Sequence, residues 1–276
     1  MKFGCFSLDF RRFSLETAFR TAARYGFDGI EIWGGRPHAY PYDMDAEAVQ
    51  KILGLKKTYG LEVPVYTPNA LGMPYNLCSL DGREQRDALD YFKTAIRACR
   101  QMETPRMLMV ADHPGYETPR RESFRRFVEN MRELGEYAQD HSVKLMIEAL
   151  TPVESPVITT ADDCLEAIQE IGLPNIEAMM DVVPPHIVCE PYSAYFEKLG
   201  DKMNYIHLCN NDGRTDAHLR LDTGELPVAD MLNVFQMHGF EGYVTVELYS
   251  ECYQDPELLL ANASRILSQI RSDLNL

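Results

Sequence analysis

Four residues of types that bind divalent cations occur in the second half of the chain, each in or at the end of a short apolar stretch. They are Glu148 in LMIE, Asp181 in AMMD, His207 in YIHL and Glu247 in VTVEL. Successive members lie about 25 to 40 residues apart, roughly the length of one strand plus one helix. If each stretch is a strand of one parallel barrel, the four side chains meet at the carboxyl ends of the strands, where barrel enzymes hold their active sites.

This grouping of ionisable side chains predicts a metal site. Burying three carboxylates and an imidazole together without a cation would cost many kcal/mol. A divalent ion held by Glu148, Asp181, His207 and Glu247 would remove that cost. Oxygen and nitrogen ligands without a thiolate favour Mn²⁺ or Co²⁺, while Zn²⁺, Ni²⁺ and Mg²⁺ remain compatible. We therefore expect one divalent metal ion.

The elements that must position these residues alternate along the whole chain. Short stretches rich in β-branched and aromatic residues predict eight strands, at 3–8, 29–33, 62–66, 107–111, 143–148, 177–181, 204–208 and 243–248. Amphipathic stretches lie between them, one opened by Ser14 as an N-cap and another by Asp255 before Pro256. The 276 residues give about 34 per unit, as in barrels of this size.

These units predict an α/β fold, a single (β/α)8 TIM barrel over residues 1–276, because no linker or low-complexity stretch divides the chain. The alternative is an open doubly wound sheet. Such a sheet usually has a Gly-rich phosphate-binding turn after its first strand, and the segment LDFRR at 8–12 has none.

Composition limits the classes of partner. The 27 Lys and Arg residues against 42 Asp and Glu residues give a net charge of −15, which repels nucleic-acid phosphates and anionic membranes, so we expect neither as a partner. The seven Cys have no close spacing and are expected to be reduced, mostly buried thiols. No apolar run approaches the roughly 18 residues that span a bilayer, so the protein is expected to be soluble and cytoplasmic.

The order Glu, Asp, His, Glu on the last four expected strands resembles the xylose-isomerase-like barrels and, within them, the ketose 3-epimerases. Further segments that resemble this family are GIEIWGGRPHA (29–39), YTP (66–68), PYN (74–76), LTPVES (150–155) and YFEKLGDK (195–202). The resemblance covers nearly the whole chain. It implies an isomerase that inverts C3 of a small-molecule ketose or a glycated amino acid, most closely fructoselysine or psicoselysine.

The resemblance also implies roles for single residues. Glu148 and Glu247 would serve as the acid/base pair as well as metal ligands, and Glu154 would contact the sugar hydroxyls. The chemistry of the reaction requires such a pair. The C3 hydrogen of a ketose lies next to the C2 carbonyl, and a metal ion can stabilise the enediolate that forms when this proton leaves. Inversion then needs one carboxylate on each face of the planar intermediate.

Other polar residues follow the expected strands and are candidates for contact with the substrate, with a solvated loop as the alternative. They are Arg36, His38, His113, His186, Asp216 and His218. The chain departs from the family at Pro184, where many relatives have His, and His186 follows two residues later. This departure affects the expected substrate contacts and leaves the expected metal ligands intact.

Other functions remain open at this point. A 3-epimerase of a free ketose such as allulose or tagatose, an aldose–ketose isomerase and a non-catalytic sugar-binding barrel share much of the pattern. A three-zinc DNA repair enzyme resembling endonuclease IV is disfavoured by the net charge and by Thr67 and Pro184, which stand where that family needs His. The family resemblance also implies a homo-oligomer. Tyr40, Tyr42 and Tyr253 are aromatic residues in loops near the expected mouth of the barrel, and we expect them to contact a neighbouring subunit.

Overall fold

The computed structural model describes residues 1–72, 74–249 and 254–274. Its centre is a closed barrel of parallel strands in the order β1 to β8, with β8 paired to β1. The strands are β1 (Lys2–Phe6), β2 (Gly29–Gly34), β3 (Val65–Pro68), β4 (Arg106–Val110), β5 (Lys144–Glu148), β6 (Ile176–Asp181), β7 (Met203–Leu208) and β8 (Tyr243–Val246). The predicted TIM-barrel fold class is confirmed.

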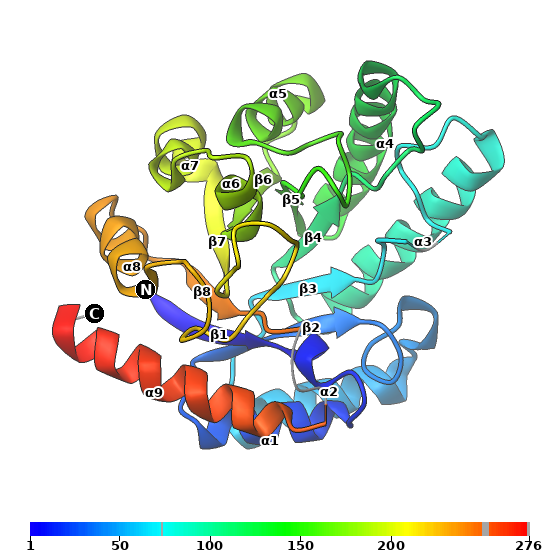
Figure 1. The fold of residues 1–276 in the computed structure, drawn as a ribbon. Helices are drawn as coiled ribbons and strands as arrows, with labels where there is room; N and C mark the ends of the chain where they lie inside the picture. Colours follow the sequence, from blue (N-terminus) through cyan, green and yellow to red (C-terminus); the bar gives the residue numbers. More distant parts are fainter. Residues whose placement is uncertain (73, 250–253, 275–276) are drawn as a thin grey trace.

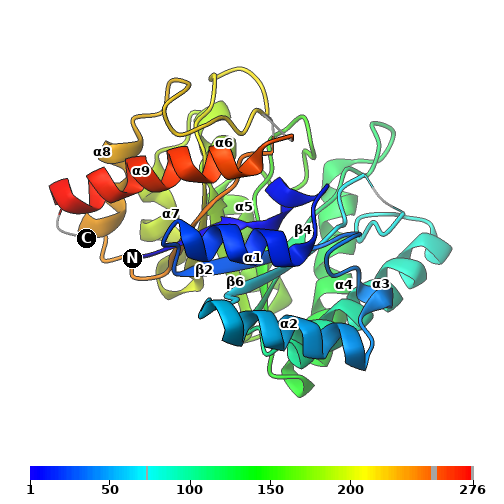
Figure 2. The ribbon, with the colours of Figure 1, turned by 90° about the horizontal axis from the view of Figure 1, so that it is seen from below.

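Helices surround the barrel (Figure 1). They are α1 (Leu15–Arg24), α2 (Ala46–Tyr59), α3 (Gly82–Gln101), α4 (Arg120–Asp140), α5 (Ala161–Ile171), α6 (Val183–Ile187), α7 (Tyr192–Leu199), α8 (Val228–Met237) and α9 (Pro256–Leu274), with short 3-10 turns at Ser7–Phe10, Pro41–Asp43 and Gly200–Lys202. Figure 2 shows α2 and α9 on either side of α1. The last helix therefore closes the ring of helices against the first, as β8 closes the barrel against β1.

The helix starts follow from capping side chains. Ser14 accepts a hydrogen bond from the backbone N–H of Thr17, and Asp255 accepts one from the N–H of Leu258, so both predicted caps are confirmed. The strands also occur where they were predicted, except that β1 and β8 end two residues earlier, at Phe6 and Val246, and β3 begins at Val65 instead of residue 62. Pro64 has no N–H to donate, and residue 62 makes an isolated bridge with Gly29.

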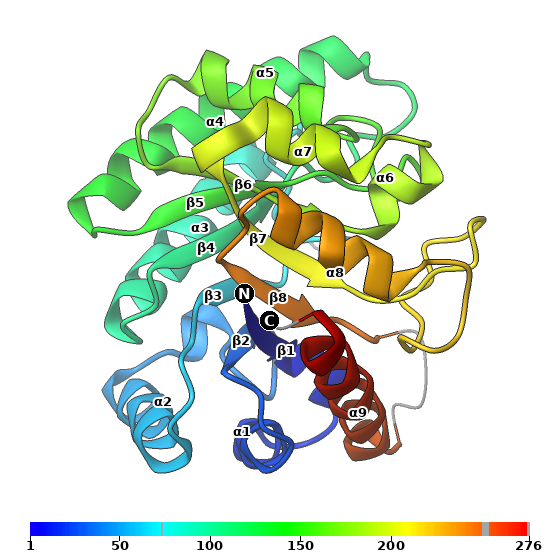
Figure 3. The same ribbon diagram turned by 90° about the vertical axis from the view of Figure 1, so that its left-hand side faces the viewer.

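The strand register places the functional residues level with one another. Glu148 is the last residue of β5, and Asp181, the last residue of β6, pairs with His207 of β7. The pairing shifts between Ala178 and Met180, where β7 contains one residue more than β6. The 209–227 loop that follows β7 extends beyond the carboxyl ends of the strands (Figure 3).

The structure also bears on the expectations about membrane spans, cysteines and subunit contacts. No described helix is long and apolar enough to cross a membrane. Six cysteines are free thiols, of which only Cys189 is exposed, and Cys252 lies outside the described residues. Tyr42 is 52% exposed and contacts the ring of Tyr40, while Tyr253 is also outside the described part of the chain. The homo-oligomer stays a prediction.

Candidate active site and metal centre

A cavity of about 190 Å³ lies at the carboxyl ends of the strands. It brings together six of the residues identified in the sequence, namely Glu148, Glu154, Asp181, His207, His218 and Glu247. The rest of its described wall is largely apolar or aromatic, formed by Phe6, Leu8, Trp33, Thr67, Pro68, Asn69, Ala70, Leu71, Leu108, Val110, Leu150 and Tyr249. A small polar molecule can thus meet the acidic groups while its carbon skeleton packs on apolar side chains.

The backbone at Glu247 is fixed although β8 ends one residue earlier. The N–H of Glu247 donates to the carbonyl of Leu208 at 3.1 Å, which continues the pairing with β7. The next N–H, that of Leu248, donates to Asp9 Oδ1 at 3.0 Å. These two hydrogen bonds fix the backbone so that the Glu247 carboxylate faces the cavity inside the barrel, next to His207.

The two nitrogens of His207 have different surroundings. Nδ1 lies 3.0 Å from Glu247 Oε2 and 3.3 Å from Glu148 Oε1, yet it is buried and makes no hydrogen bond. Ligand atoms of Glu148, Asp181 and His207 all lie within 4.8 Å of one another. A buried nitrogen directed at carboxylates without a hydrogen bond is the arrangement expected of a metal ligand, so these residues fit a divalent cation.

The other nitrogen of His207 contacts a residue that the sequence analysis does not identify. Nε2 lies 2.8 Å from Glu31 Oε2, and both side chains are almost fully buried. Thr67 donates its hydroxyl to the other oxygen of Glu31. A carboxylate behind a ligating imidazole fixes its tautomer and ring orientation and raises its basicity. The available sequence signal was a charged residue at an interior position of the apolar strand GIEIW.

The electrostatics of the site follow from burial and crowding of carboxylates. Burial raises the pKa of Glu148 to about 7, and Asp181 and Glu247 add to the rise. Burial would lower the pKa of His207, but the Glu31 and Glu247 carboxylates outweigh it and raise that pKa well above its usual value. A carboxyl group with a pKa near neutrality can both accept and donate a proton under ordinary conditions.

A second acidic group lines the wall of the cavity. Glu154 Oε2 accepts hydrogen bonds of 3.0 Å from the backbone N–H and the hydroxyl of Thr151. Burial raises the pKa of Glu154 to about 8, and the charge of Asp216 adds to this shift. Asp216 itself accepts a hydrogen bond from the hydroxyl of Tyr249 at 2.9 Å. This wall attracts hydroxyl and ammonium donors.

Two of the candidate substrate contacts lie in a different cleft. Arg36 and His38 line a separate surface pocket and do not line the barrel cavity. Arg36 pairs with Asp43 through two hydrogen bonds, of 2.5 and 2.7 Å. His38 Nε2 contacts the carbonyl of Phe13 at 3.0 Å. Each side chain has a local partner that directs it away from the cavity.

Three further candidates do not belong to the described wall of the cavity. His113 Nδ1 accepts the N–H of Gly115, and His113 packs against Tyr116. His186 lies on α6 and is half-buried. Asp216 reaches the cavity through its hydrogen bond to Tyr249. Their direct contact with a substrate stays a prediction.

Asp9 is a buried carboxyl group beside the site. It is 3% exposed, and its Oδ2 has no hydrogen-bond partner. Burial raises its pKa to about 8, and Glu247 adds to the rise. The folded protein therefore retains a proton that the unfolded chain releases above about pH 4. The contribution of this group to stability is largest below that pH and is lost as the pH rises towards 8.

We accordingly expect Asp9→Asn to become more stable relative to wild type as the pH is raised from about 5 to about 8.5. The measurement is thermal unfolding of the metal-free proteins at both pH values. The matched control is Glu47→Gln, which changes an exposed carboxylate on α2 and should show no such trend. A constant difference between Asp9→Asn and wild type at all pH values would contradict the expectation.

Comparisons with known proteins agree with the barrel fold. A model of the xylose isomerase-like TIM barrel family matches residues 19–270. Fructoselysine 3-epimerase of Shigella flexneri is 39% identical, with 95% of each chain covered. The fructoselysine 3-epimerase of Escherichia coli O157:H7 is 38% identical, covering 95% of this chain and 96% of that protein. A crystal structure of a D-tagatose 3-epimerase-like protein has a TM-score of 0.84 at 20% identity, covering 100% and 98% of the two chains, which shows a shared fold.

Proposed function

The chain belongs to the xylose isomerase-like TIM barrel family and, within it, to the sugar epimerases and isomerases, and from this premise we propose that it inverts C3 of fructoselysine or psicoselysine. The single observation that carries the proposal is the placement of two glutamates around one imidazole. Glu148 of β5 and Glu247 after β8 lie 3.3 and 3.0 Å from the same nitrogen of His207. Inversion of a carbon next to a carbonyl requires two such groups, one for each face of the planar intermediate, and this proposal assigns one face to each glutamate.

In this proposal Glu148, Asp181, His207 and Glu247 hold one divalent ion, Mn²⁺ or Co²⁺ in preference to Zn²⁺, Ni²⁺ or Mg²⁺. When bound, such an ion supplies a Lewis acid that stabilises the negative charge developing on the substrate oxygens. Glu31 orients His207 for this role.

The protein's own residues move the proton. One of Glu148 and Glu247 removes the C3 proton from its face of the sugar, and the other delivers a proton to the opposite face. Before the ion binds, burial among carboxylates raises the pKa of Glu148, and the charge of a bound ion would favour the carboxylate form that removes the proton. The apolar residues around the cavity limit the polar groups near the intermediate, so that the two glutamates are the proposed proton carriers on its two faces.

The wall of the cavity supports an unphosphorylated substrate with an amine. No Lys or Arg is among the described residues that line the cavity, so a phosphate group would lack the charged side chains that usually bind it there. Glu154, with Asp216 behind Tyr249, places acidic groups at the wall. In fructoselysine the sugar carries the ε-nitrogen of lysine at C1, and its positive charge beside Glu154 would favour the charged carboxylate and lower the pKa that burial raises. We also propose a cytoplasmic location, since the described cysteines are free thiols.

The test is a ranking of C3 epimerisation rates in Mn²⁺-loaded protein with fructoselysine, psicoselysine, fructose, allulose and tagatose. We expect the two glycated lysines to give the highest kcat/KM. Glu154→Gln should reduce this preference, because it removes an acidic group from the wall, whereas Glu190→Gln, outside the cavity lining, should not. Faster turnover of a free ketose would overturn the assigned substrate, and interconversion with an aldose would overturn the assigned reaction.

The contact between Glu31 and His207 leads to a prediction about metal affinity. Glu31→Gln keeps the shape of the side chain but replaces the carboxylate with a weaker acceptor, so we expect Mn²⁺ to bind about 10 to 100-fold more weakly. Isothermal titration calorimetry measures this directly. The control Glu62→Gln changes an exposed glutamate that pairs with Lys2 and should leave the affinity unchanged. Equal affinities in the wild type and Glu31→Gln would contradict the assigned role of Glu31.

A further inference from the structure

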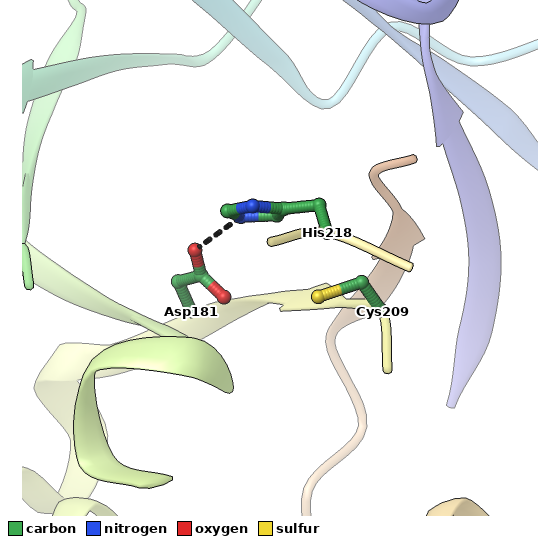
Figure 4. A group of neighbouring side chains, drawn as sticks. All are labelled: Asp181, Cys209 and His218. Carbon is green, nitrogen blue, oxygen red and sulfur yellow. Dashed lines mark hydrogen bonds and ion pairs between the residues drawn. The ribbon is translucent and has the colours of Figure 1, made fainter. Parts of the chain in front are cut away.

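Asp181, Cys209 and His218 form a second group of possible metal ligands, next to the first. Figure 4 shows the three side chains converging on one point. All three are buried, and one ligand atom from each lies within 4.8 Å of the others. We propose that they form a second divalent-metal site, selective for ions that bind thiolate, above all Zn²⁺ and Co²⁺.

The fold builds this group from a strand end and a returning loop. Cys209 directly follows β7, two residues after His207, and is fully buried near Asp181. The loop then folds back, and Leu219 exchanges two backbone hydrogen bonds with Asn210, of 2.8 and 2.9 Å. This bridge places His218 beside Cys209. The ligands therefore sit on backbone that is already fixed by pairing.

The spacing of the polar atoms suits coordination of a single ion. His218 Nε2 lies 2.9 Å from Asp181 Oδ2 and 3.4 Å from Glu247 Oε2. An imidazole, a thiolate and one or two carboxylates are all donor types that Zn²⁺ binds. The surrounding carboxylates favour a cation, and binding would displace the thiol proton to solvent and form a metal–sulfur bond.

The donor types distinguish the second site from the first. The first set offers oxygens and one nitrogen, which suit Mn²⁺ and Mg²⁺, whereas Cys209 adds a soft sulfur that those ions avoid. Asp181 is the member common to both groups. Asp181 could therefore serve both ions, and sites with two neighbouring ions occur in several classes of enzyme. We therefore expect the second ion to bind without displacing the first.

Cobalt absorption tests the proposal because a Co²⁺–thiolate bond gives a charge-transfer band in the near ultraviolet that oxygen and nitrogen ligands do not give. Protein loaded with one equivalent of Mn²⁺ is titrated with Co²⁺, and release of Mn²⁺ is followed by electron paramagnetic resonance. We expect the band to saturate near one equivalent of Co²⁺ with Mn²⁺ retained. Cys209→Ser should lose the band.

The matched control is Cys99→Ser, which removes an equally buried thiol on α3 and should retain the band. His218→Gln tests the second ligand and should weaken Co²⁺ binding at least tenfold while the Mn²⁺ stays bound. Circular dichroism verifies the fold of each variant, and Cys209→Ala replaces Cys209→Ser if that variant is unfolded. The proposal is overturned if wild type shows no band, if the band survives in both Cys209 variants, or if Co²⁺ only displaces Mn²⁺.

Discussion

Glu247→Gln is expected to lower net C3 epimerisation by about 10² to 10⁴-fold while Glu148 continues to exchange one hydrogen with solvent. Glu148 remains able to remove the C3 proton from its own face and return a proton there. One epimer of the substrate should therefore take up deuterium at C3 from deuterated solvent without inverting, and the other epimer should not. Glu148→Gln should show the reverse preference, because Glu247 then acts alone.

The measurement is deuterium incorporation at C3 by NMR, started separately from each epimer. Both glutamates are also proposed metal ligands, so each variant must first be shown to retain its ion. Loss of the ion would by itself stop hydrogen exchange at C3 on both faces. Glu190→Gln serves as the matched control and should exchange and invert as wild type does. Equal exchange from both epimers in a metal-loaded single variant would mean that one base reaches both faces, and the two-glutamate mechanism would be abandoned.

Removal of the metal is expected to abolish activity, and Mn²⁺ or Co²⁺ is expected to restore it. Without the ion, the imidazoles of His207 and His218 are the cationic groups of the described wall, and both lie against carboxylates, at Glu31 and Asp181, that offset their charge. His207→Ala should weaken metal binding and be rescued in part by excess metal, because three carboxylate ligands remain.

The experiment is exhaustive chelation followed by metal analysis, an activity assay and readdition of single ions. His141→Ala is the control for the histidine substitution, since His141 lies at the end of α4, away from the cavity. Full turnover by protein shown to contain no metal would refute the metal-dependent mechanism. Recovery with Mg²⁺ alone would refute the expected preference among ions.

The barrel could be predicted from sequence because its signals are periodic. Each strand is a short apolar run, and each helix has an apolar stripe and a local cap such as Ser14. The grouping of Glu148, Asp181, His207 and Glu247 follows from that periodicity, since all parallel strands end at the same side of a barrel. The start of β3 was predicted three residues too early because Pro64 has no N–H to donate, which interrupts the strand pairing at that point.

The loop residues could not be placed in the same way. Arg36 follows β2 as a pocket residue would, but its nearest partner, Asp43, lies seven residues later and holds it elsewhere. Glu31 and Asp9 are single charges whose partners lie far along the chain, at His207 and Leu248. Such pairings depend on how the barrel closes, and no local pattern in the sequence encodes them.

The pairing of Glu31 with His207 has a consequence for folding kinetics. It joins positions 176 residues apart, one in the second strand and one in the seventh. Contacts of such long range form late, after the cost in chain entropy of closing the barrel has been met. An ion that needs an oriented His207 therefore binds a chain that has already closed, and it stabilises the native state more than the transition state. Mn²⁺ should slow unfolding in stopped-flow measurements and leave the rate of refolding nearly unchanged.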